Sequence, residues 1–64
     1  MKVYDDRDLG YISVAEGNEN IQMSIIGNKG LEDLWAFIYN NNKYQSTNVS
    51  YLINKAKNLI SKNN

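Results

Sequence analysis

The fold of this chain is decided by residues 11–26, which read YISVAEGNENIQMSII. Apolar side chains take alternate positions on both sides of a polar, glycine-containing centre: Ile12, Val14, Ile21, Met23 and Ile25. Alternation with a period of two is typical of half-buried strands, and a short polar segment between two such runs is typical of a hairpin loop. The stretch therefore predicts two antiparallel strands, over about 11–15 and 21–26.

A third strand is expected ahead of these two, over about 2–5, joined to them through the polar turn at Asp6-Arg7-Asp8. The first part of the chain then reads as a three-stranded antiparallel meander. Gly27-Asn28-Lys29-Gly30 is expected to end this sheet as a plain turn. The turn lacks the G-x-x-x-x-G-K-[ST] spacing of a phosphate-binding loop, and the acidic Glu32 and Asp33 that follow would repel an anion.

Helical spacing replaces the period of two after this turn, at Leu31, Leu34, Trp35 and Ile38. It predicts a helix over about 30–41, with acidic side chains in its first turn and asparagines at its end. Apolar side chains, including Phe37 and Tyr39, surround nearly the whole of this helix. Either the helix is central, packed between the sheet and a second helix, or Phe37 and Tyr39 face solvent or a partner.

The clearest helical pattern lies at the C-terminal end, over about 48–61. Its apolar stripe consists of Val49, Leu52, Ile53, Ala56, Leu59 and Ile60, and Ser46, Thr47 and Asn48 are all suitable N-caps. Taken together, the patterns predict one α+β domain over residues 1–64. In this fold a three-stranded antiparallel meander (about 2–5, 11–15 and 21–26) is followed by two helices (about 30–41 and 48–61), both packed on one face of the sheet.

The composition restricts how so short a chain can be stabilised, because it contains no histidine, no cysteine and no proline. Domains of this size bury a small core and are often stabilised by a disulfide, a metal or a second subunit. The first two need residues that are absent here, so we expect self-association, as a homodimer. The acidic start and the lack of a long apolar run predict a cytoplasmic protein without a membrane segment.

Catalysis and metal binding find little support in these residues. General acid–base chemistry near neutral pH usually recruits histidine, and nucleophilic catalysis needs a cysteine or a serine with its base. Asp5, Asp6 and Asp8 form an acidic cluster, but its spacing departs from that of a calcium-binding loop, and a solvated turn explains it. We therefore predict no enzyme activity, no cofactor and no metal site.

Charge is distributed unevenly, although the chain has seven basic and seven acidic side chains and no net charge. Residues 1–39 carry three basic and seven acidic side chains, whereas residues 40–64 carry four lysines and no acid. The second helix places four side chains suited to nucleic acid on one polar face: Tyr51, Lys55, Asn58 and Lys62. Nucleic-acid binding through this face is the alternative function, weakened by the neutral domain and by the lack of arginine in the helix.

Protein binding is the function that the composition favours. Tyrosine and tryptophan, which anchor many interfaces, are frequent in this short chain. The expected interface residues are Tyr4, Tyr11 and Ile26 on the outward face of the sheet, with Phe37 and Tyr39 on the first helix. The sequence thus predicts a small module that binds a larger protein and modulates or inhibits it. Its richness in asparagine, lysine, isoleucine and tyrosine indicates AT-rich coding, as in an accessory (viral) protein of a phage or mobile element.

Overall fold

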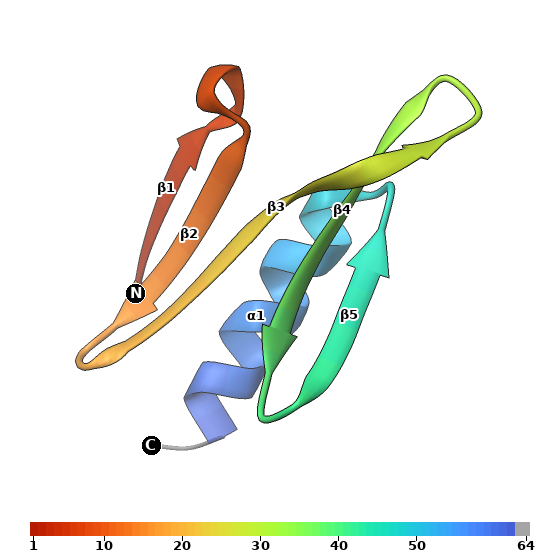
Figure 1. The fold of residues 1–64 in the computed structure, drawn as a ribbon. Helices are drawn as coiled ribbons and strands as arrows, with labels where there is room; N and C mark the ends of the chain where they lie inside the picture. Colours follow the sequence, from red (N-terminus) through yellow and green to blue (C-terminus); the bar gives the residue numbers. More distant parts are fainter. Residues whose placement is uncertain (63–64) are drawn as a thin grey trace.

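The computed structural model of the chain, described over residues 1–62, is a five-stranded antiparallel sheet followed by an α-helix (Figure 1). In chain order its elements are β1 (Lys2–Asp6), the short 3-10 helix η1 (Arg7–Leu9), β2 (Tyr11–Glu16), β3 (Glu19–Lys29), β4 (Glu32–Tyr39), β5 (Asn42–Ser46) and α1 (Val49–Lys62). The strands lie in the sheet in the order in which they occur in the chain, so β1 and β5 form its two edges.

The predicted architecture of three strands and two helices is wrong, although the fold is still of the α+β type. Strands lie where the three strands were expected, and α1 lies where the second helix was expected. Residues 30–41, however, form no helix. They contain β4, and the segment after them, expected to be a loop, contains β5.

The side chains of β4 that reach the core alternate along the strand. Trp35 and Phe37 belong to the core cluster and Tyr39 packs against it, whereas Ile38 is 71% exposed and Ala36, although buried, is not part of the cluster. The apolar run fits a helix and a strand equally well, because apolar residues occupy both sets of positions. Aromatic and β-branched side chains favour the strand, and a partner strand is available on each side of it.

The turns also differ from the expectation. Asn40 and Asn41 have positive φ angles of 52° and 66°, so they form a two-residue hairpin turn between β4 and β5 and do not end a helix. The segment from Gly27 to Gly30 does not end the sheet. β3 continues to Lys29, which lies opposite Glu32, and Gly30 with its φ of 64° begins the turn into β4.

β3 is the long strand that joins the two halves of the sheet. It pairs with β2 over residues 19–24 and with β4 over residues 24–29, so the two sets of partners meet at Ser24. The register shifts between Ile25 and Gly27, which leaves Ile26 as the extra residue of a β-bulge. In Figure 1, β2 and β4 therefore diverge from β3 in opposite directions.

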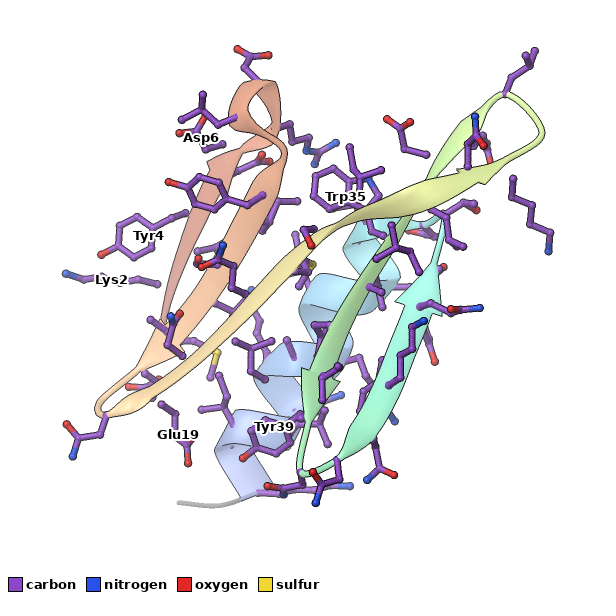
Figure 2. The ribbon with its side chains drawn as sticks, viewed as in Figure 1. Lys2, Tyr4, Asp6, Glu19, Trp35 and Tyr39 are labelled. Atoms are coloured by element: carbon purple, nitrogen blue, oxygen red, sulfur yellow. The ribbon has the colours of Figure 1, made fainter. Side chains whose placement is uncertain are left out.

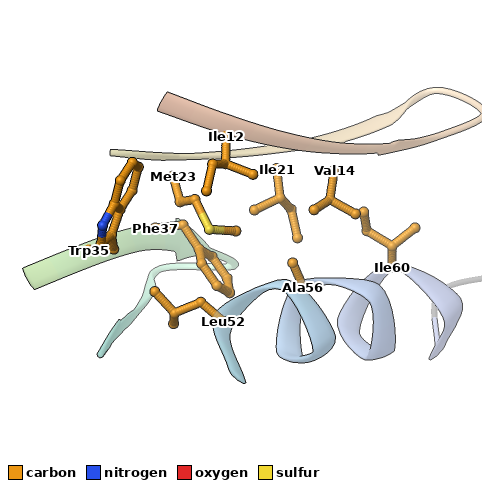
Figure 3. Packing of buried hydrophobic residues seen from close by; sticks show 9 residues of the cluster. All are labelled: Ile12, Val14, Ile21, Met23, Trp35, Phe37, Leu52, Ala56 and Ile60. Atoms are coloured by element: carbon orange, nitrogen blue, oxygen red, sulfur yellow. The ribbon is translucent and has the colours of Figure 1, made fainter. Parts of the chain in front are cut away.

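The core lies between one face of the sheet and α1. The helix begins after Asn48, whose Oδ1 accepts a hydrogen bond from the Tyr51 backbone N–H at 3.1 Å, as an N-cap does. Its buried stripe, Leu52, Ala56 and Ile60, faces the sheet. Figure 3 shows this stripe packed against buried side chains of β2, β3 and β4: Ile12, Val14, Ile21, Met23, Trp35 and Phe37. α1 thus covers one face of the sheet.

Because β4 is a strand, neighbouring residues on it should contribute very differently to the free energy of unfolding. Phe37→Ala should lower the free energy of unfolding by about 3–5 kcal/mol because it empties a core position. Ile38→Ala, one residue away on the exposed side, should change it by no more than about 0.5 kcal/mol. Urea unfolding followed by circular dichroism measures both variants, and a larger loss for Ile38→Ala would contradict the strand.

Candidate functional site

The face of the sheet opposite α1 is the main candidate surface, and we call it the open face. The register places one set of alternating side chains on it, and Ile26 joins them at the bulge: Lys2, Tyr4, Asp6, Tyr11, Ser13, Ala15, Asn20, Gln22, Ser24, Ile26, Lys29, Glu32, Leu34, Ala36, Ile38, Lys43 and Gln45. An antiparallel sheet with one solvated face normally carries polar side chains there. Most of this face is polar, so its exposed apolar side chains stand out.

A hollow of about 450 Å³ lies on the open face, near the point where β4 leaves β3. It is open to solvent and lined by Gln22, Ser24, Ile26, Ala36, Phe37, Ile38 and Lys43. Ile26 and Ile38 give it apolar walls, Gln22 and Ser24 offer hydrogen-bond donors and acceptors, and Lys43 adds a positive charge. Such a surface can hold an apolar side chain and bind the polar groups around it.

Three of the predicted interface residues lie on this face. Tyr4 on β1 is 54% exposed, and Tyr11 on β2 is half-buried and diagonal to it, since Tyr4 pairs with Ser13 and Asp6 with Tyr11. Ile26 lies at the bulge of β3, is 47% exposed and lines the hollow. The alternation of the first three strands was therefore sufficient to place these residues on one face.

The other two predicted interface residues lie on the opposite side of β4. Phe37 is 3% exposed, and its ring stacks on Tyr44 with the ring centres 5.0 Å apart. Its side chain points toward α1 in Figure 3, so it borders the hollow from the core side of the sheet. Tyr39 is half-buried and packs against the core. Partial burial, and to a smaller extent the negative charge of Glu19, raise the pKa of Tyr39 above its usual value.

The residues of the alternative nucleic-acid face lie on the solvent side of α1. Tyr51 is 54% exposed and Asn58 and Lys62 are exposed, so these three are available to a ligand. Lys55 is half-buried, with its Nζ 5.6 Å from the centre of the Tyr44 ring, where it makes a cation–π contact. Lys55 therefore already makes a contact within the chain and is less accessible to a ligand than the other three residues.

Several residues of the hollow were not predicted from the sequence. Ile38 was assigned to the stripe of a helix, and Lys43 to a loop, because β4 and β5 were not recognised. The signal that could have identified Ile38 is the alternation of Trp35, Phe37 and Tyr39, which places Ile38 on the other side of a strand.

Two of the acidic side chains make ion pairs within the chain. Asp5 pairs with Arg7, with 3.0 Å between Oδ2 and Nε, and Glu16 pairs with the amino group of Met1 at 3.1 Å. Within residues 1–62, no group of three or more acidic side chains is placed to hold a metal ion. No helix in the same range is long and apolar enough to cross a membrane.

Comparison with known proteins gives no family for this chain: no family model, no curated protein and no solved structure matches it.

The position of Tyr39 near Glu19 predicts a pH effect. Because the pKa of Tyr39 is raised in the folded chain, its neutral form stabilises the fold below the usual tyrosine pKa of 10.0, and this contribution is lost as the pH rises through the folded pKa. Glu19→Gln should lower the Tyr39 pKa, because it removes the smaller of the two causes. An ultraviolet absorbance titration, with Tyr39→Phe to identify the signal, measures this. Glu32→Gln should have no effect, and an equal shift for both variants would contradict the assignment.

Proposed function

We propose that this chain is a non-enzymatic protein-binding module, which modulates or inhibits a larger protein by docking it on the open face. The observation that carries the proposal is the pair of isoleucines, Ile26 and Ile38, exposed on either side of the hollow. Two large aliphatic side chains that stay in water gain no burial energy from folding, and apolar patches on a polar face frequently mark interaction sites. A partner side chain that fills the hollow would remove both from water.

The remainder of the open face is also suited to a protein partner. Tyr4 and Tyr11 provide large, rigid side chains with a hydroxyl group, and serine, asparagine and glutamine provide flexible hydrogen bonds around them. The hollow is open rather than enclosed. Among the lining residues that the structure describes, Lys43 is the only charged one. An extended patch of this kind fits a protein surface better than a buried small molecule.

The proposal predicts that Ile26→Asp together with Ile38→Asp abolishes binding of the partner and leaves the fold intact. Both side chains are exposed, so the charges can be accommodated in the free chain, but each would be buried without a counter-charge in a complex. The measurement is affinity purification of the tagged chain from host lysate treated with nuclease, followed by mass spectrometry. The protein that co-purifies with the wild-type chain should be absent with this variant.

The matched control for this experiment is Lys57→Glu together with Lys62→Glu, which places two new carboxylates on α1, away from the open face. This control should retain the partner in full. Equal recovery of the partner with both variants would contradict docking on the open face. Circular dichroism and urea unfolding establish that both variants are folded.

A second candidate function is nucleic-acid binding through α1. The observation in its favour is that the helix carries Lys55, Lys57 and Lys62 and no acidic side chain, with Tyr51 exposed on its outer side. If this face binds DNA or RNA, Lys55→Glu with Lys62→Glu should weaken binding by at least about tenfold, and the affinity should fall steeply with salt. Fluorescence anisotropy with labelled oligonucleotides tests this, and binding that is insensitive to salt would contradict it.

A further inference from the structure

The edge strand β1 differs from the other strands in contributing nothing to the core. None of its five residues is buried or packs against the core cluster, whereas β2, β3 and β4 each bury two or more side chains and β5 packs the half-buried Tyr44 against the core. β1 pairs with β2 on one side, and within residues 1–62 no strand lies along its other edge, which carries backbone N–H and C=O groups. Such an edge can accept a strand from another chain unless it is protected.

The side chains of β1 show which strand would fit this edge. On the open face, β1 carries Lys2, Tyr4 and Asp6 in a row, as Figure 2 shows for the labelled side chains on this strand. The row therefore reads positive, aromatic, negative along the strand. When the same row runs in the opposite direction beside it, each lysine meets an aspartate and the two tyrosines meet each other.

We propose that β1 pairs with β1 of a second copy, in antiparallel register centred on Tyr4, to form a two-fold symmetric dimer with one continuous sheet. This register places Lys2 of each copy opposite Asp6 of the other, and Tyr4 opposite Tyr4. Opposite charges and aromatic pairs directly across two antiparallel strands stabilise the pairing. A two-fold interface must be self-complementary, and this row of three side chains is. This interface shares Tyr4 with the open face but includes none of the residues that line the hollow, so it does not depend on the proposed function.

The competing registers are less favourable. A shift of one residue would bring side chains of opposite faces of the sheet together. A shift of two residues toward the C-terminal end would centre the pairing on Asp5 and place the two Asp5 carboxylates opposite each other. A shift of two toward the N-terminal end would pair fewer residues and lose both contacts between Lys2 and Asp6.

In the proposed register, the inner face of β1 introduces no unpaired charge. Val3 would lie opposite Asp5, but the Asp5 carboxylate already pairs with the Arg7 guanidinium of its own chain. Asp6 makes no side-chain hydrogen bond that caps η1, so it is available to the second copy.

The other edge of the sheet offers no comparable match. β5 carries one charged side chain, Lys43, and a two-fold pairing centred on Tyr44 would place it opposite Gln45. Tyr44 is already stacked on Phe37 and contacted by Lys55. Charge complementarity therefore selects β1. Because five residue pairs bury less area than a standard interface, the dimer should be weak and depend on concentration.

The test is sedimentation equilibrium of the full chain at low salt, at concentrations up to about 1 mM. The wild-type chain should reach a dimer, and Lys2→Glu or Asp6→Lys alone should weaken dimerisation by at least about tenfold, because each places like charges opposite each other twice. The double variant Lys2→Glu/Asp6→Lys should restore the dimer, since the reversed row is again self-complementary. Lys43→Glu, on the other edge, should leave it unchanged.

A mixture of the two single variants provides a second test of the proposed pairing. The Lys2→Glu chain has two acidic positions on this row and the Asp6→Lys chain has two basic ones, so the mixture should form a heterodimer although neither chain dimerises well alone. A wild-type chain that stays monomeric at all concentrations would overturn the inference. So would a dimer that survives both single reversals, or a mixture that stays monomeric. Circular dichroism confirms that each variant is folded.

Discussion

The contact between α1 and one face of the sheet is the interaction on which the rest of this structure depends. Leu52, Ala56 and Ile60 are each fully buried against side chains from β2, β3 and β4, and most of the buried apolar side chains belong to this one layer. For a chain of 64 residues, a stability of about 3–10 kcal/mol is expected in total. One core truncation can remove a large part of that, so this layer determines whether the chain folds.

A single helix covers a single face, and this has two consequences for function. The opposite face of the sheet stays in water, together with two isoleucines and the hollow between them. In addition, β1 buries no side chain and pairs with β2 alone among the described strands. The surfaces proposed for a partner protein and for a second copy are thus the two parts of the sheet that the helix leaves uncovered. If both are used, the open faces of two copies join into one surface around Tyr4.

The sequence was sufficient where one pattern fitted better than its rivals. Alternation at Ile12, Val14, Ile21 and Met23, and the stripe of α1, located three strands and a helix. It was not sufficient at Leu34–Tyr39, where adjacent apolar residues satisfy both periods and the choice depends on pairing with β3 and β5. That error also removed Ile38 and Lys43 from the predicted site and placed Phe37 in it. The positive φ angles of Asn40 and Asn41 show that an Asn-Asn pair can form a hairpin turn as well as end a helix.

In this structure β4 is a strand, and Ile38 lies in water on the face of the sheet opposite α1. Nuclear magnetic resonance with a soluble paramagnetic agent can test this arrangement, because the agent broadens the methyl signals that it can approach. The structure predicts strong broadening for Ile26 and Ile38 and protection for Ile12, Ile21 and Ile60, with strand chemical shifts over residues 32–39. Protection of Ile38, or helical shifts in that segment, would contradict the account.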